Sequence, residues 1–378
     1  MSTQKVTDPV IDGVFSSVLT GTLPVLDGSA LTGVAGFVNT TNANDPATNT
    51  NPATGVGTVW CNSTSGEVFV CTDATAGANV WTNVGAGSGD IFPWAVQGSI
   101  AGYTLGGTAQ GSQIEKFAFP SDGSATAAGT FENSNNWTGL GYKSASHGYS
   151  TACSLSRIEK FQIASDGNGA TVADMHMAKG YAAAGNSVTH GYAAAGDYPL
   201  NKTIDRFDFA AESTGVDHGD MTLDRWQPSG CSSETYGYAA GGGRPGQGSN
   251  INVIDKYAFG SNANGTDVGD LVAGRNSGMS NGASSTTHGY ISGSYHNSNA
   301  IDKWTFSSDN NATDVGNLTA GRGFSGNVSS TTHGYHLGGK TAGGSINVRD
   351  KWSFVNDGNA VDAGDLSGAN ADFGTIQT

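Results

Sequence analysis

The chain has 378 residues, 58 of them glycine, and its 32 acidic and 17 basic residues give a formal net charge of −15 at pH 7. This acidity argues against a nucleic-acid binder, which needs a basic surplus to neutralise phosphates, and the glycines lack the three-residue period of collagen. No apolar run is long enough to span a bilayer, so we expect no membrane insertion.

The first fifty residues predict an extended segment with no core of its own. They begin without a basic region followed by an apolar core, so no secretory signal is expected. Residues 20–37 are punctuated by glycine, and residues 39–55 are rich in Asn, Thr and Pro, which is typical of a linker. We expect residues 1–50 to be an anchoring and oligomerisation segment that a partner surface must order.

Residues 51–90 predict a small β-hairpin module. The hairpin turns around Ser65 and Gly66, and the sequence ANVWTNVGAG supplies a third strand. Three short strands are marginally stable alone, so we expect this module to lean on a partner chain or on the rest of the protein. Four cysteines make no disulfide framework, and we expect free thiols, with a Cys61–Cys71 pairing left open.

From about residue 97 the chain consists of repeats. A Gly-Tyr pair recurs six times, about 46 residues apart, with its tyrosines at Tyr103, Tyr149, Tyr192, Tyr238, Tyr290 and Tyr335. A second landmark (IEKF, IDRF or IDKW) recurs at the same period, with its cations at Lys116, Lys160, Arg206, Lys256, Lys303 and Lys351. Two landmarks therefore give the same period and the same count.

Each repeat predicts four short strands and no helix. In the fifth repeat, alternation places Ile301 and Lys303 on one face of a strand and Asp302 and Trp304 on the other. A period of 40–50 residues with four strands is typical of a β-propeller blade. The fold class expected is all-β, with a six-bladed propeller over residues 91–378. The tail SGANADFGTIQT aligns with the strand that precedes each Gly-Tyr, so residues 372–377 should complete the first blade.

The order of the strands resembles the kelch repeat family. GYTLGG at Gly102 and GYHLGG at Gly334 match its double-glycine strand, and Arg225, Arg275 and Arg322 match its arginine. In addition, LPVLDGSALTGV and GTVWCNSTSGEVFVC resemble segments of phage fibre and tail proteins, and the repeat is similar to kelch-like repeats in structural proteins of marine and cyanobacterial phages.

This resemblance implies a structural protein exposed on a phage virion. Residues 1–50 would bind other virion proteins, the chain would be a homotrimer, and the propeller would be displayed, as in a tail or head fibre, for attachment to a host-surface glycan. Two alternatives stay open: a capsid decoration or head fibre without a receptor role, and a carbohydrate-active or oxidative propeller enzyme.

The residues whose side chains can bind a metal or take part in catalysis are explained by structural roles. The sequence therefore predicts no catalytic residue, no metal and no cofactor. Four histidines precede the Gly-Tyr pairs, and we expect repeat-consensus hydrogen bonds rather than a metal ring: His147, His190, His288 and His333. Four turn aspartates lack the spacing of a calcium loop, so we expect them to cap their turns and the repeated cations to pair with strand neighbours: Asp122, Asp166, Asp309 and Asp357.

The loops after the double-glycine strands vary most among the repeats and predict the binding face. Their candidate ligand-binding residues are Tyr198, Arg244, Tyr295 and His296. Aromatic and arginine side chains dominate many recognition surfaces and suit sugar rings and hydroxyls.

Overall fold

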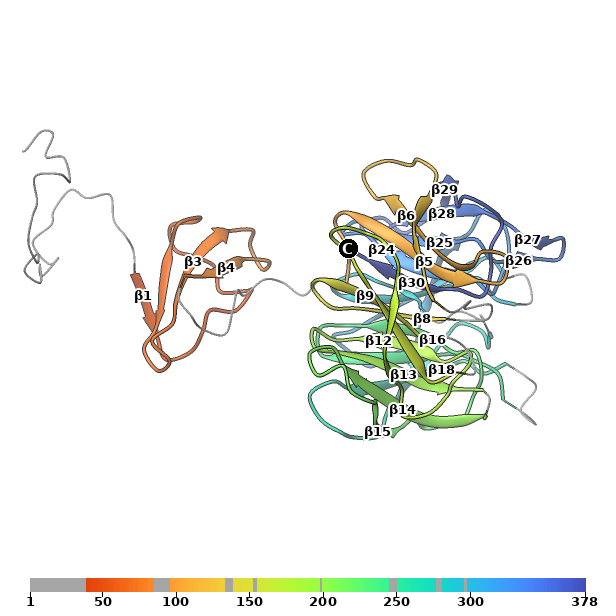
Figure 1. The fold of residues 1–378 in the computed structure, drawn as a ribbon, viewed down its shortest axis with the longest axis horizontal. Helices are drawn as coiled ribbons and strands as arrows, with labels where there is room; N and C mark the ends of the chain where they lie inside the picture. The colour runs from red at the N-terminus through yellow and green to blue at the C-terminus, as the bar shows by residue number, and fades with distance from the viewer. Residues whose placement is uncertain are drawn as a thin grey trace, which may run out of the picture. The chain divides into compact units, whose positions relative to one another are not determined.

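The computed structural model describes residues 39–84, 96–132, 139–151, 155–197, 199–244, 250–276, 281–295 and 298–378. Every regular element in these ranges is a β-strand, which confirms the all-β class, and these ranges contain no helix long and apolar enough to cross a membrane. The chain divides into two compact units, Met1–Pro93 and Trp94–Thr378 (Figure 1).

The first unit contains a four-stranded sheet, in chain order: β1 (Asn39–Asn42), β2 (Val59–Asn62), β3 (Val68–Asp73) and β4 (Val80–Asn83). The predicted hairpin around Ser65 and Gly66 is confirmed, because β2 and β3 pair antiparallel across it. Its core holds Trp60, Phe69, Cys71 and Trp81. Cys61 and Cys71 both carry free thiols.

The interpretation of residues 39–55 as a linker is wrong. Strand β1 pairs in parallel with β2, and the Trp60 indole donates a hydrogen bond to the carbonyl of Asn44 at 2.9 Å. The Asn79 amide donates to the carbonyl of Thr48 at 2.8 Å. Polar, turn-forming residues fill linkers and tightly hydrogen-bonded loops alike, so composition alone could not separate the two.

The second unit is built from six four-stranded antiparallel sheets, which we number in chain order. Sheet 1 has β5 (Ala101–Gly107), β6 (Gly111–Ala118), β7 (Thr126–Thr130) and the C-terminal β30 (Gly374–Gln377). Sheet 2 has β8 (Leu140–Lys143), β9 (His147–Thr151), β10 (Arg157–Gln162) and β11 (Ala170–Asp174). Sheet 3 has β12 (Ala183–Asn186), β13 (His190–Gly196), β14 (Asn201–Asp208) and β15 (Val216–Asp220).

The remaining three sheets repeat this plan. Sheet 4 has β16 (Ser229–Ser232), β17 (Tyr236–Ala240), β18 (Val253–Ala258) and β19 (Thr266–Asp270). Sheet 5 has β20 (Ala283–Ser284), β21 (His288–Ser292), β22 (Ala300–Thr305) and β23 (Thr313–Asn317). Sheet 6 has β24 (Gly326–Ser329), β25 (His333–Leu337), β28 (Val348–Ser353) and β29 (Val361–Asp365), with a small hairpin of β26 (Lys340–Thr341) and β27 (Gly344–Ser345).

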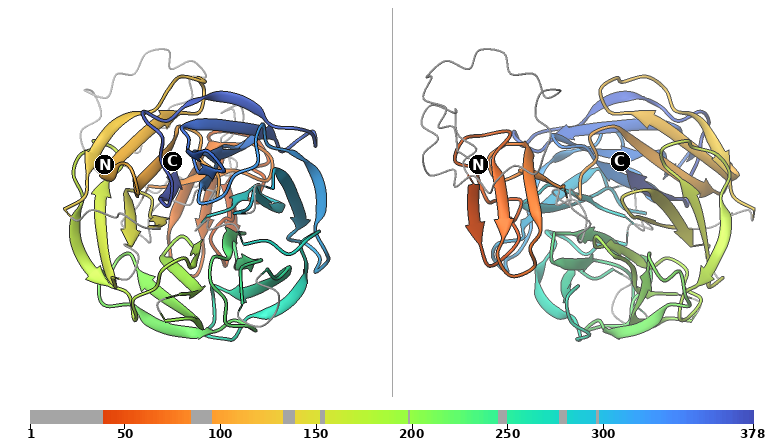
Figure 2. Two further views of the ribbon diagram at one scale, coloured as in Figure 1. Left: turned by 90° about the vertical axis from the view of Figure 1, so that its right-hand side faces the viewer. Right: turned by 60° about the vertical axis from the view of Figure 1, so that its left-hand side comes forward.

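The C-terminal strand completes sheet 1, as the sequence predicted. Strand β30 pairs antiparallel with β5, from Gly374 opposite Leu105 to Gln377 opposite Gly102. The first strands of neighbouring sheets touch in the order β30, β8, β12, β16, β20, β24 and back to β30, and Figure 2 shows the sheets of this unit side by side around a common centre. Glycine permits this approach, because a Cβ at Gly141 would collide with the carbonyl of Thr375.

The repeated cation of the third strand joins each sheet to the next. Lys351 of sheet 6 reaches Asp122 of sheet 1, with its ammonium 2.6 Å from the carboxylate. The equivalent pairs are Lys116–Asp166, Lys160–Glu212, Lys256–Asp309 and Lys303–Asp357, and Arg206 donates instead to Asn262. The sequence predicted that these aspartates cap their turns and that the cations pair with strand neighbours, but the aspartates and cations pair with each other. The partner lies one repeat away.

A second set of ion pairs is buried. The aspartate beside the repeated cation meets an arginine or lysine from the connection that leads into its sheet: Lys179–Asp205, Arg225–Asp255, Arg275–Asp302 and Arg322–Asp350. The alternation predicted for the fifth repeat does not separate buried from exposed residues, because Ile301 and Asp302 are both fully buried. Each sheet lies between two others, so both of its faces are covered.

Candidate functional site

The second unit has two opposite ends, which we name by their loops. The loop face carries the described parts of the loops that follow the second strands: residues 197, 199–200, 241–244, 250–252, 293–295, 298–299 and 338–347. The hairpin face carries the turns between first and second strands: residues 144–146, 187–189, 233–235, 285–287 and 330–332. Figure 1 shows the small hairpin β26–β27 on the loop face.

Two of the four predicted binding residues lie in the described part of the loop face. Arg244 forms an ion pair with Asp224 at 2.9 Å. Tyr295 is 50% exposed, and its ring packs edge-on against Phe324, with ring centroids 4.8 Å apart. Tyr198 and His296 fall outside the described residues. Arg244 and Tyr295 belong to neighbouring sheets and have different partners.

Tyr295 is part of a larger group that the sequence did not reveal. Tyr181 lies 6.5 Å from Phe324 between ring centroids, and the Lys340 ammonium lies 4.9 Å from the Phe324 ring. Lys340 also pairs with Asp372 at 2.5 Å. We call Tyr181, Tyr295, Phe324, Lys340 and Asp372 the loop-face cluster. Because Tyr181 precedes sheet 3 and Phe324 precedes sheet 6, the cluster joins connections that are far apart in the chain.

Three members of the cluster occupy a strained backbone position. Tyr181, Phe324 and Asp372 have positive φ angles of 52°, 56° and 58°, and Gln227, at the equivalent position of sheet 4, has 56°. A left-handed conformation in such residues costs about 1–2 kcal/mol and persists only where the surroundings impose it. Each of these four residues lies two positions after a polar residue in the connection that leads into its sheet: Lys179, Arg225, Arg322 or Asn370. The varied residues at this position were the signal that could have identified the cluster.

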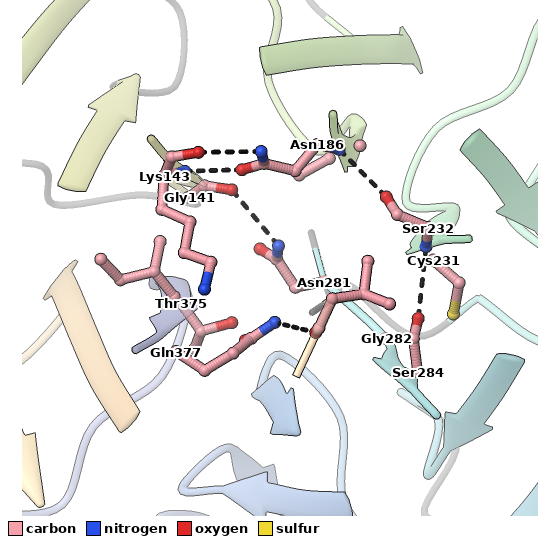
Figure 3. A pocket seen from close by; sticks show the side chains of 15 residues that line it. Gly141, Lys143, Asn186, Cys231, Ser232, Asn281, Gly282, Ser284, Thr375 and Gln377 are labelled. Atoms are coloured by element: carbon pink, nitrogen blue, oxygen red, sulfur yellow. Dashed lines mark hydrogen bonds between the residues drawn. The ribbon is translucent and has the colours of Figure 1, made fainter. Parts of the chain in front are cut away.

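A narrow cavity lies among the first strands near the hairpin face (Figure 3). The Lys143 side chain points into it among Asn281, Thr375 and Gln377, and desolvation lowers the pKa of Lys143 to about 8. The cavity offers about 40 Å³ to water, and one water needs about 10–15 Å³, so it holds a few waters and excludes a sugar ring.

The repeated histidines lie on the hairpin face, one in each of four sheets. The Nδ1 atom of each is 2.7–2.8 Å from the hydroxyl of the preceding Ser or Thr: His147, His190, His288 and His333. Within the described ranges, no three His, Cys, Asp or Glu side chains gather as metal ligands. Cys231 is buried with a free thiol, and burial raises its pKa to about 12.

The lowered pKa values of the histidines predict that the folded protein is less stable in acid. Burial lowers the pKa of each of the four, and it lowers the pKa of buried His336 furthest below its usual value, with Arg322 as the second cause. The unfolded chain then binds more protons, so the stabilisation present above about pH 6.5 is lost as the pH falls. We expect the melting temperature to decrease from pH 7 to pH 5.

The matched variant is His336→Asn, which keeps a polar partner for the Ser292 hydroxyl, 2.8 Å from His336 Nδ1, and does not titrate. Its melting temperature should depend less on pH than that of the wild type. Equal slopes in the two proteins would contradict this prediction.

In a comparison with known proteins, no protein-family model and no curated protein matches the sequence.

Proposed function

We propose that the second unit is a six-bladed, kelch-like β-propeller, and that the chain is a non-enzymatic, fibre-like appendage of a phage virion that attaches to a host-surface glycan. The propeller assignment is supported by six four-stranded sheets, by the cyclic contacts of their first strands and by the pairing of β30 with β5. The virion assignment is supported by the segments that resemble phage fibre proteins.

The loop-face cluster is the observation that carries the binding role. It places the aromatic rings of Tyr181, Tyr295 and Phe324 beside the Lys340 ammonium and the Asp372 carboxylate. A sugar has an apolar face that packs on aromatic rings and hydroxyls that both donate and accept hydrogen bonds, so this combination suits a saccharide. The strained backbone of the cluster agrees with a functional constraint.

The described chain of the second unit begins on the hairpin face. There Gly98 donates its backbone N–H to the carbonyl of Ser329 at 2.7 Å. The side chain of Gln97 donates to Thr331, and that of Gln377 donates to Val96.

Adsorption of variant particles tests this proposal. We expect Tyr295→Ala combined with Lys340→Ala to slow adsorption to host cells about tenfold or more, because both side chains are accessible and anchor residues dominate recognition surfaces. The control is Val355→Ala, a 79% exposed residue on the hairpin side, which should adsorb normally. Particles that carry the double variant at full occupancy and adsorb at the wild-type rate would favour a capsid decoration without a receptor role.

A further inference from the structure

Two grooves occur at equivalent places on the hairpin face. One, of about 380 Å³, lies between sheets 2 and 3, and the other, of about 220 Å³, lies between sheets 6 and 1. Each is formed by the hairpin turn of one sheet and the turn between the third and fourth strands of the next. We call them groove 2–3 and groove 6–1.

The grooves share their chemistry. A histidine and a tyrosine come from one sheet, and a phenylalanine that packs on the tyrosine comes from the next. In groove 2–3, Tyr149 and Phe209 stack with centroids 4.8 Å apart beside His147. In groove 6–1, Phe119 and Tyr335 lie 5.2 Å apart beside His333. The floor of each groove is therefore aromatic, with an imidazole at its side.

Hydroxyl and carboxylate groups line the rims. Ser144, Ser146 and Thr189 contribute hydroxyls to groove 2–3, and Glu212 contributes a carboxylate. Glu212 accepts hydrogen bonds from the Lys160 ammonium at 2.6 and 2.8 Å and from the Tyr149 hydroxyl at 3.3 Å. A carboxylate has about four acceptor positions, so Glu212 retains capacity for a ligand hydroxyl.

The charges in both grooves are balanced. Lys160 neutralises Glu212, and Lys351, which lines groove 6–1, is paired with Asp122. Burial lowers the pKa of His147 and of His333, so both imidazoles are neutral at pH 7. An ion gains little from such a site, whereas a neutral ligand with one apolar face and many hydroxyls matches it. The volume of groove 2–3 falls within the range of small-molecule sites.

We propose that grooves 2–3 and 6–1 are binding sites for a neutral pyranose sugar, separate from the loop face, so that one chain engages a saccharide at several points. The equivalent interface between sheets 1 and 2 supplies an internal comparison. There Ala101 stands in place of the histidine and Ile163 in place of the phenylalanine, so that interface lacks the imidazole and the phenylalanine that stacks on the tyrosine.

Saturation-transfer NMR on the purified full chain tests this directly. The probes are the methyl glycosides of glucose, galactose, mannose, rhamnose and N-acetylglucosamine. We expect at least one of them to receive saturation, mainly at the protons of one ring face. The variant His147→Ala alters groove 2–3 alone. It should weaken sugar binding there about two- to tenfold, as expected for one lost hydrogen bond.

A bulky side chain that fills a groove distinguishes sugar binding in that groove from sugar binding elsewhere on the protein. Ala145 and Thr331 are exposed, equivalent residues of the two hairpin turns that line the grooves. The occluded variant Ala145→Trp, Thr331→Trp is made in a chain that already carries Tyr295→Ala and Lys340→Ala, so that the loop face contributes no binding. It should keep the melting temperature of that parent chain and lose the saturation transfer that the parent shows. Val355→Ala, at a residue that lines neither groove, should keep the wild-type transfer.

Three results would overturn the groove proposal: no transfer to any of the five glycosides, transfer that persists in the occluded variant, or no transfer in the parent chain with Tyr295→Ala and Lys340→Ala. None of them decides the adsorption experiment, which compares wild-type particles with loop-face variants whose grooves are unchanged.

Discussion

Deletion of residues 373–378 is expected to abolish cooperative folding of the second unit. The deletion removes β30, which pairs with β5 and touches both β8 and β24. It also removes Phe373 and Ile376, whose side chains are 2% and 3% exposed. Truncating two such side chains costs about 5–10 kcal/mol, which equals most or all of the stability of an ordinary domain.

Circular dichroism during heating and size-exclusion chromatography measure this effect in the full chain. We expect a broad, low-temperature transition or an aggregated protein, and Ile376→Asp should give the same result without shortening the chain. Val355→Ala is the control and should melt like the wild type. A truncated protein that melts in one sharp transition within about 2 °C of the wild type would show that β30 does not hold the second unit together.

The second large effect concerns the buried ion pairs. Asp350 is fully buried and binds the Arg322 guanidinium at 3.1 Å, the backbone N–H of Thr319 at 2.8 Å and the Thr319 hydroxyl at 2.7 Å. Asp350→Ala leaves the arginine buried without its counter-charge, which typically costs about 3–5 kcal/mol. We expect the melting temperature to fall by roughly 10 °C.

The matched control is Lys303→Ala, which removes an ion pair from the surface. Asp357, the partner of Lys303, is about half exposed, so this pair should contribute no more than about 1 kcal/mol. Chemical denaturation of both variants gives the two free energies. Equal losses in the two variants would contradict the distinction between buried and surface pairs.

The sequence predicted what repeats locally and missed what depends on the packing of neighbouring repeats. The period of the Gly-Tyr pairs and the alignment of the tail were enough to place β30 in sheet 1. The pairing of Lys116 with Asp166, in the next sheet, was missed because both residues also have acceptable local roles in strands and turns. Only the packing of neighbouring sheets makes them partners.

The binding face was predicted in the same partial way. Variable loops identified Tyr295, but Tyr181 and Phe324 lie in short connections rich in small residues, where the signal for them was the varied residue two positions after the cation. They come together because the connections into sheets 3 and 6, which are far apart in the chain, meet in the folded protein. Likewise, the Asn- and Thr-rich composition of residues 39–55 concealed a strand that pairs in parallel with β2.

The central claim, that this chain is a displayed virion appendage, is tested most directly by immunogold electron microscopy. An antibody against the chain is applied to intact phage particles purified from cultures that produce it. We expect gold at fixed positions on the outside of the particles, on a fibre of the tail or of the head. Gold that is absent from intact particles would contradict the account.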